Sequence, residues 1–165
     1  MFSFGQIFLL SIFLVLAQGL SLGDHQNGEI VIGKEPGKLE NSTTFTIEGR
    51  NYFVSGHKLN WDKAKRSCWN MGMQLVAIES LEENNAILRE VSGDRSAFWT
   101  SGTDQGQEGY FVWDTTGQSV GFSYWAHGEP NNFFGNEHCI KMKSSSHQWN
   151  DNACWDSEKY ICEQL

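Results

Sequence analysis

The feature that most constrains this chain is a stretch near the C-terminus that is rich in side-chain oxygen atoms and interleaved with cysteines. The oxygens come from Glu129-Pro130-Asn131, Glu137 and Trp149-Asn150-Asp151. Cys139 and Cys154 lie inside and just beyond this stretch, where they could clamp it. Calcium requires hard oxygen ligands from several groups, and carboxylates with amides can also accept and donate hydrogen bonds to hydroxyls. The pattern therefore predicts a calcium site that also binds hydroxyl groups.

The N-terminus has the pattern of a secretory signal peptide over residues 1–19. Its apolar run, from Ile7 to Ala17, precedes small residues at the cleavage-determining positions, Ala17 and Gly19. A membrane anchor is the alternative, but the run is shorter than the roughly 20 residues that span a bilayer, and basic flanking residues are missing. We expect a secreted, extracellular protein without a membrane span, in which residues 20–42 form a flexible arm.

The formal net charge of −8 limits the classes of partner. An acidic protein is a poor match for nucleic acid or anionic lipid, so we expect no nucleic-acid partner. Metal cations would offset part of the charge. Asn41-Ser42-Thr43 is an N-glycosylation sequon, which predicts a glycan on Asn41 in a surface loop.

The four cysteines predict two disulfides, because a secreted protein meets an oxidising environment. They are Cys68, Cys139, Cys154 and Cys162. The sequence by itself allows three pairings. A four-cysteine zinc site is the alternative, and it is disfavoured because no two cysteines have the close spacing of a zinc knuckle.

The first half of the chain predicts a hairpin and two helices. Residues 45–55 alternate around a turn at residues 48–51, as in a β-hairpin. Asn60 can cap a helix that ends at Gly72. The residues on one face of this helix, and so expected in the core, are Trp61, Ala64, Cys68 and Met71. Ser80 opens a capping box for a second helix, whose apolar period is approximated by Leu81, Asn84, Asn85, Leu88 and Val91.

Short apolar runs predict strands at 75–78, 98–100 and 110–113, with closing strands at 148–149 and 159–162. After Val120 the chain becomes loop-like and carries the oxygen-rich stretch. This order of elements resembles the C-type lectin-like fold, an α+β double-loop fold with two helices and two small antiparallel sheets. The resemblance covers residues 45–163, and we assign residues 43–165 to one carbohydrate-recognition domain of the short form.

The resemblance, to the Glu-Pro-Asn mannose-type subclass in particular, implies which residues act together. It implies Cys68–Cys162 and Cys139–Cys154 disulfides. It also implies that one calcium ion, and two vicinal sugar hydroxyls on that ion, are bound by Glu129, Asn131, Glu137, Asn150 and Asp151. The Glu129–Pro130 bond is expected to be cis by the same resemblance, whereas an ordinary trans turn is the base-rate alternative.

An auxiliary calcium site is a further expectation from the resemblance. Asp104 and Glu108 match its first two ligands, Asn132 occupies a third position, and Glu137 could be shared. Asn132 and His138 both stand where the family usually has Asp, and two fewer negative charges lower the affinity for a divalent ion.

Three other side chains near the stretch have open interpretations. His138 could couple calcium release to acid pH, but a surface histidine without a role is the simpler expectation. Phe133 and Phe134 could stack on a sugar or pack beneath it, and we expect one to be packed and the other exposed. Trp99, Trp113, Trp125 and Trp149 are expected in the core.

The function predicted from these patterns is that of a secreted, calcium-dependent, mannose-type lectin that recognises microbial or cell-surface glycans in innate immunity. The alternatives are a calcium-stabilised protein-binding module and a galactose-preferring lectin. A glycosidase would use Glu129 and Glu137, but calcium ligands must be ionised whereas a general acid keeps its proton, so we expect no enzyme activity. Weak monovalent binding would require clustered glycans or several domains, as in a homo-oligomer.

Overall fold

The computed structural model describes residues 41–143, 146 and 148–165. The predicted signal peptide, residues 1–19, and almost all of the predicted arm, residues 20–42, lie outside the described residues. Asn41 of the sequon is exposed, so a glycan there would meet solvent. No helix in the described ranges is both long enough and apolar enough to cross a membrane.

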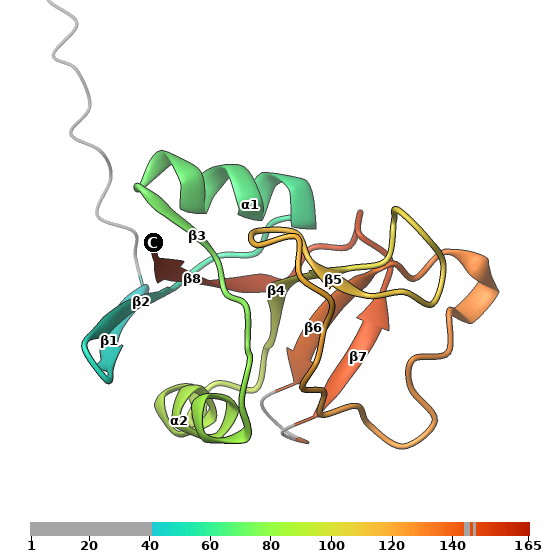
Figure 1. Ribbon diagram of the computed structural model, residues 1–165. Helices are drawn as coiled ribbons and strands as arrows, with labels where there is room; N and C mark the ends of the chain where they lie inside the picture. The colour runs from blue at the N-terminus through green and yellow to red at the C-terminus, as the bar shows by residue number, and fades with distance from the viewer. Residues whose placement is uncertain (1–40, 144–145, 147) are drawn as a thin grey trace, which may run out of the picture. The chain divides into compact units, whose positions relative to one another are not determined.

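Two α-helices, one 3-10 turn and eight strands form the described part of the chain (Figure 1). In chain order they are β1 (Thr43–Ile47), β2 (Arg50–Val54), α1 (Trp61–Asn70), β3 (Met73–Leu75), α2 (Leu81–Val91), β4 (Ala97–Thr103), β5 (Val112–Trp113), η1 (Phe133–Gly135), β6 (Cys139–Lys143), β7 (Trp149–Asn152) and β8 (Lys159–Gln164).

The C-terminal strand β8 joins two groups of strands. It pairs antiparallel with β2 and β3 on one side, and β2 forms a hairpin with β1. On the other side it runs parallel to β4, which pairs antiparallel with β5 and β6, and β6 pairs with β7. The predicted α+β class is confirmed, and the parallel β4–β8 pairing makes the two antiparallel groups continuous.

The hairpin at residues 43–54 follows the sequence prediction. Ile47 pairs with Arg50, so the turn contains two residues, Glu48 and Gly49. Both have positive φ, 49° and 85°. A two-residue turn of this kind matches the twist of the flanking strands. Glycine meets this requirement at no steric cost, and glutamate meets it with some strain.

Helix α1 begins as predicted and ends one residue earlier than its apolar face suggested. The side chain of Asn60 accepts a hydrogen bond from the backbone N–H of Lys63 at 3.0 Å, which satisfies a free donor of the first turn. Trp61, Ala64 and Cys68 are buried. Met71 is not: it is the C-cap residue, and 37% of it is exposed, because the helical spacing no longer applies once the helix has ended.

Helix α2 begins at the predicted capping residue, since Ser80 accepts from the backbone N–H of Glu83 at 3.1 Å. Its buried face is rotated from the predicted one: Leu81 and Asn85 are exposed, while Ala86 and Ile87 are buried with Leu88. Asn84 is buried, and its side-chain oxygen accepts from the indole N–H of Trp149 at 2.9 Å. The helix therefore contributes a polar contact that supports the strand carrying Asn150 and Asp151.

The core lies in two clusters on either side of β4 and β8. One packs α2 against the β-strands and includes Trp113 and Trp149. The other lies beneath α1 and includes Trp61 and Trp99. Cys68 on α1 is bonded to Cys162 on β8, as the resemblance implied. Trp125, expected in the core, is only partly buried against the first cluster.

The strand predictions hold in part. Residues 76–78 are buried but irregular, because β3 ends at Leu75, and of residues 110–113 only Val112 and Trp113 form a strand. Strand β6 was not predicted. It alternates apolar and lysine residues only briefly, and its pairing with β4 and β7 is long-range.

Candidate functional site

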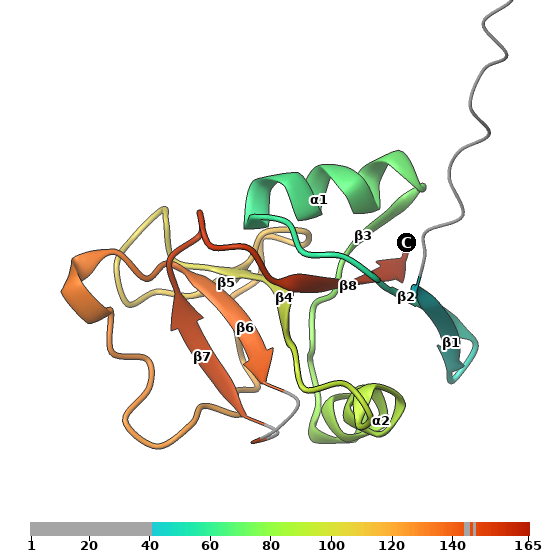
Figure 2. The ribbon, with the colours of Figure 1, turned by 180° about the vertical axis from the view of Figure 1, so that it is seen from behind.

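The oxygen-rich segment between β5 and β6 lies beside β7, at the end of the domain away from the β1–β2 hairpin (Figures 1 and 2). Two backbone hydrogen bonds attach its first part to β7: Trp149 N–H donates to the carbonyl of Tyr124, and Ala126 N–H donates to the carbonyl of Trp149, both at 2.8 Å. The Trp149 ring makes edge contacts with Phe122 and Trp125. The buried Trp149 on β7 therefore positions the segment at residues 122–126, which precedes the Glu129-Pro130-Asn131 triplet.

Asp151 holds the triplet itself. One of its carboxylate oxygens accepts from the backbone N–H of Asn131 at 3.1 Å, and the other accepts from that of Asn132 at 2.7 Å. The residue is 1% exposed. Hydrogen bonds from two backbone amides stabilise the negative charge of a buried carboxylate. The loop and β7 are thus held in one arrangement by a predicted calcium ligand.

Glu137 makes two hydrogen bonds to the part of the loop that follows the triplet. Its carboxylate accepts from the backbone N–H of Phe133 at 3.1 Å, and its own N–H donates to the side-chain oxygen of Asn132 at 3.0 Å. The two bonds enclose the η1 turn at Phe133–Gly135. Glu137 is therefore held near Asn132, although the two residues are five positions apart.

Glu129 is the one residue of the predicted set with a side-chain oxygen that is both buried and without a hydrogen-bond partner. Its peptide bond to Pro130 is cis, as expected. Oε2 of Glu129 is buried and has no hydrogen-bond donor in the described part of the chain. Burial raises the pKa of the Glu129 carboxyl. Asp151 raises this pKa further, through a hydrogen bond between the two carboxyl groups and through charge repulsion. Charge repulsion from Glu137 acts in the same direction.

These contacts fit a divalent cation between Glu129 and Asp151. A buried carboxylate and a partly buried one that lie together cannot both be ionised cheaply without a positive charge between them. A calcium ion would satisfy the free oxygen of Glu129 and allow both groups to ionise. Carboxylate and amide oxygens are also the donor types that this ion takes.

A positively charged side chain of the protein, Lys143, contacts the predicted ligand Asn150. The side-chain oxygen of Asn150 accepts from the ammonium group of Lys143 at 3.2 Å, and its amide nitrogen donates to the carbonyl of Asp151. The same lysine lowers the pKa of Glu129. For Asn150 to bind a metal ion, its oxygen must exchange the lysine for the ion.

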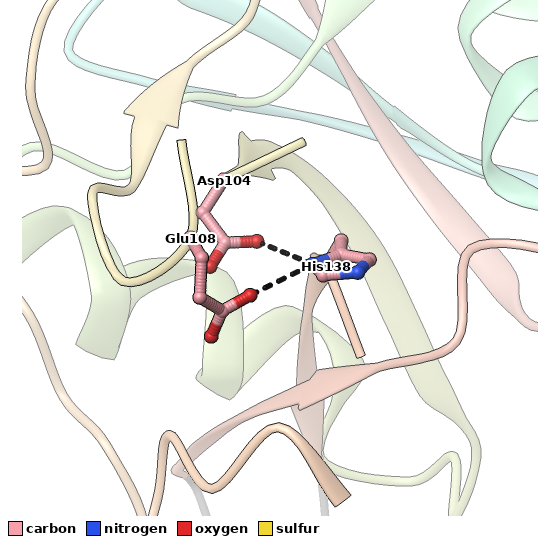
Figure 3. Close-up of side chains that lie close together, drawn as sticks. All are labelled: Asp104, Glu108 and His138. Atoms are coloured by element: carbon pink, nitrogen blue, oxygen red, sulfur yellow. Dashed lines mark hydrogen bonds and ion pairs between the residues drawn. The ribbon is translucent and has the colours of Figure 1, made fainter. Parts of the chain in front are cut away.

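Asp104, Glu108 and His138 form a second group of possible metal ligands (Figure 3). Within the described ranges, it is the one group of three acidic, histidine or cysteine side chains whose ligand atoms all lie within 4.8 Å of one another. Nδ1 of His138 lies 3.0 Å from Asp104 Oδ1 and 3.3 Å from Glu108 Oε2. Glu129, Glu137 and Asp151 are spread more widely.

This arrangement changes the expectations for the auxiliary site. Asp104 and Glu108 do lie together, but Asn132 is bonded to Glu137 instead of joining them. His138 was expected to be a surface residue without a role. Its side chain is 30% exposed and contacts both acids, so the residue is partly buried and has two partners. The sequence placed His138 beside Glu137, and only the loop at residues 104–109 brings the acids to it.

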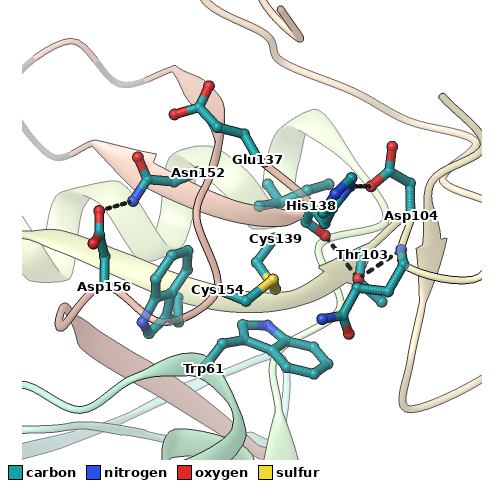
Figure 4. Close-up of a disulfide and its surroundings, with 12 residues drawn as sticks. Trp61, Thr103, Asp104, Glu137, His138, Cys139, Asn152, Cys154 and Asp156 are labelled. Carbon is teal, nitrogen blue, oxygen red and sulfur yellow. Dashed lines mark hydrogen bonds and ion pairs between the residues drawn. A yellow bond between two sulfur atoms is a disulfide. The ribbon is translucent and has the colours of Figure 1, made fainter. Parts of the chain in front are cut away.

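The Cys139–Cys154 disulfide lies close to Glu137 and His138, below both of them in Figure 4. Cys139 opens β6 directly after Glu137 and His138, and Cys154 follows β7. In Figure 4 the carboxylate of Glu137 points away from the contact between Asp104 and His138. The pairing is the one that the resemblance implied, and it ties both groups to the same pair of strands.

Phe133 and Phe134 are both exposed, by 60% and 85%, so the expectation that one would be packed is wrong. Their ring centroids lie 4.2 Å apart, and Phe134 has a positive φ of 57°. The two rings pack on each other at an interplanar angle of 54°. They leave an apolar patch beside the oxygen ligands.

Two hollows of the surface, of about 600 Å³ and 560 Å³, are both lined by Arg50. Neither is lined by any of the five predicted ligands, so the candidate site lies outside both hollows.

Comparison with known proteins gives consistent relationships. A family model described as "Lectin C-type domain" matches residues 57–164. The chain is 37% identical over 128 residues to "Lectin subunit alpha" of Sarcophaga peregrina, covering 71% of this chain and 45% of that protein. It is 35% identical over 170 residues to "C-type lectin 37Da" of Drosophila melanogaster, covering 94% and 91%. The chain thus spans about half the length of the first relative and most of the second.

A solved structure of a C-type carbohydrate-recognition domain has a similar fold. The carbohydrate-recognition domain of cow CD23, determined in the presence of a GlcNAc2Man3 oligosaccharide, superposes with a TM-score of 0.68 at 28% identity, covering 74% of this chain and 92% of that one.

Proposed function

This chain belongs to the C-type lectin domain family, and we propose that it is a secreted protein that binds mannose-type sugars in a calcium-dependent manner. The observation that carries the proposal is the buried, unpartnered Glu129 oxygen facing Asp151. Carbohydrate binding is the property of the family's recognition domain, and the GlcNAc2Man3 oligosaccharide in the cow CD23 structure supports the mannose type. The two disulfides and the predicted signal peptide support secretion.

The proposed calcium ligands are the five residues that the sequence singled out. They are Glu129, Asn131, Glu137, Asn150 and Asp151. When bound, the ion would supply positive charge and open coordination positions for two hydroxyl oxygens. The chain's own contribution is directional: the carboxylate of Glu129 accepts a hydrogen bond from one hydroxyl, while the side-chain amide of Asn131 donates a hydrogen bond to another. Charge makes such bonds stronger than neutral ones.

This polarity is the basis for the proposed sugar class. An acceptor at residue 129 and a donor at residue 131 suit vicinal equatorial hydroxyls, as on C3 and C4 of mannose. Galactose has an axial 4-hydroxyl, which fits the same pattern less well. The small contact surface implies a dissociation constant of about 1 mM per site. Recognition of clustered glycans on microbial or host surfaces, and a role in innate immunity, would then depend on several sites acting together.

One observation favours galactose as a second candidate ligand. Phe133 and Phe134 are exposed beside the ligand residues, and an aromatic ring can pack on the apolar face of a pyranose. The hydrogen-bond polarity of the ligand residues favours mannose, whereas the exposed aromatic rings favour galactose. We give the polarity more weight, because it acts on the hydroxyls at the ion, where charge strengthens each hydrogen bond.

Retention on immobilised mannan, with free mannose or galactose as competitor, tests the proposal. Wild-type protein should be retained in calcium and released more readily by mannose. Glu137→Ala removes a proposed ligand and should abolish retention, whereas Glu90→Gln, on the exposed face of α2, should not. Stronger release by galactose would show that the phenylalanines set the choice, and loss of retention in both variants would contradict the assigned site.

A further inference from the structure

The side chains of Asp104, Glu108 and His138 converge from two segments of the chain (Figure 3). Asp104 and Glu108 lie in the loop after β4, and His138 immediately precedes β6. The family resemblance implies an auxiliary calcium ion for this place. The residues present do not fit that ion.

The misfit with calcium is one of donor type and number. Calcium takes six to eight oxygen ligands, but a ring nitrogen lies at the centre of this group, 3.0 Å and 3.3 Å from the two acids. The oxygen of Asn132, which the resemblance assigns to the ion, is bonded to the N–H of Glu137. The second oxygen of Asp104 is bonded to the N–H of Gly109 at 2.7 Å.

The same distances suit a smaller ion with mixed nitrogen and oxygen ligands. Zinc binds imidazole nitrogen and carboxylate oxygen at about 2.0–2.2 Å, usually as a tetrahedron. Ligand atoms on neighbouring corners of such a tetrahedron are roughly 3.3 Å apart, close to the two distances from Nδ1 of His138. We propose that Asp104, Glu108 and His138 bind one divalent transition-metal ion of the zinc class, in place of a second calcium.

The surrounding contacts hold two of the three ligands in position. The side chain of Asp104 is 1% exposed and fixed by Gly109. The backbone of His138 donates to Asn152 at 3.1 Å, and its carbonyl accepts from the hydroxyl of Thr103 at 2.7 Å (Figure 4). Glu108 is 55% exposed and leaves the group open to solvent. An ion can therefore enter from solvent, and a water molecule can complete the tetrahedron.

This site shares no ligand with the proposed sugar site, so either can fail without the other. The test is calorimetric titration of the full chain with zinc chloride in millimolar calcium, after removal of chelator. We expect one zinc ion per chain and no competition by calcium. Because changes to outer-shell contacts alone cost 10–100-fold in metal affinity, loss of a ligand in His138→Gln should weaken zinc binding by about 100-fold or more.

Two further variants make the result specific. Glu108→Gln changes an exposed side chain, so it should fold normally and also weaken zinc binding. His127→Gln changes an exposed histidine outside the group and should leave zinc binding unchanged. Absence of zinc binding by the wild-type chain, equal binding by wild type and His138→Gln, or equal losses from His127→Gln and His138→Gln would each overturn the proposal. The first of these would leave only the contacts of His138 with the two acids.

Discussion

The carboxylate of Asp151 accepts a 2.7 Å hydrogen bond from the backbone N–H of Asn132, nineteen positions earlier in the chain. The strand that follows the long loop therefore holds the middle of that loop. A residue that binds a metal ion through its charge also fixes the positions of neighbouring ligands through its two oxygens. Metal binding and loop structure should consequently respond together to changes at Asp151.

The Asp151→Asn variant should bind calcium less well and should also hold the loop less firmly. The asparagine keeps one acceptor but turns an amide group toward a backbone donor, which should cost about 1–3 kcal/mol of unfolding free energy in EDTA. It should also remove the calcium-induced rise in melting temperature. Urea unfolding in EDTA and melting curves with calcium measure the two effects. Glu90→Gln should stay within about 0.5 kcal/mol of wild type; a calcium response retained by Asp151→Asn would contradict the role assigned to it.

Calcium should stabilise the wild-type fold. Extracellular calcium modules bind with dissociation constants of about 0.1–1 mM, so at about 2 mM calcium and the tighter limit, binding adds roughly 1.8 kcal/mol. For a domain of this size that corresponds to several degrees of melting temperature. A melting temperature that does not move across a calcium titration, with magnesium as the control ion, would count against the site.

Lys143→Met should strengthen calcium binding. The lysine occupies the side-chain oxygen of Asn150 and opposes the approach of a cation to Glu129. Exposed charge contacts are worth about 0.2–1 kcal/mol, so the calcium dissociation constant should fall by a factor of about 1.4 to 5. Lys141→Met is the matched control, because this lysine lies on the same strand but pairs with Glu158 at 3.1 Å. Weaker calcium binding in Lys143→Met would show that the lysine supports the site.

Glu163 should make stability depend on pH. It is 2% exposed, and burial raises the pKa of its carboxyl, although the Ala77 N–H and Arg50 act in the opposite direction. A raised pKa means that the folded state holds the proton more tightly than the unfolded state. The carboxyl's contribution to stability is therefore greatest below the unfolded pKa, near 4.3, and is lost as pH rises through the folded pKa.

Glu163→Gln isolates this effect, because glutamine does not titrate. The unfolding free energy of wild type minus that of the variant should decrease as pH rises from about 4 and should level off above the folded pKa. Denaturant unfolding of both proteins in EDTA, from acid to neutral pH, provides the measurement and removes the separate pH dependence of calcium binding. A difference that grows with pH would mean that Arg50 outweighs burial.

Local signals in the sequence predicted the local parts of the fold. Asn60 and Ser80 mark both helix starts because capping depends on residues three positions apart. The Glu48-Gly49 turn depends on two adjacent residues. The disulfide pairing could not be obtained this way and required the family resemblance. Met71 was misplaced because helical periodicity does not show where a helix stops.

The candidate site was predictable as a set of residues but not as a set of contacts. The family resemblance predicted Glu129, Asn131 and Asp151 as ligands, yet the bond between Lys143 and Asn150 was not foreseen, because it depends on the register of β6 against β7. The contact of His138 with Asp104 joins residues 34 positions apart. Neither contact leaves a periodic pattern in the sequence.

The most direct test of the account is retention of the wild-type chain on immobilised mannan as a function of free calcium. If Glu129 and Asp151 share a calcium ion that sugar binding requires, retention should be absent in EDTA and half-maximal at about 0.1–1 mM calcium. The same titration on Asp151→Asn should remain flat. Retention of wild-type protein that is equal in EDTA and in calcium would contradict the central claim.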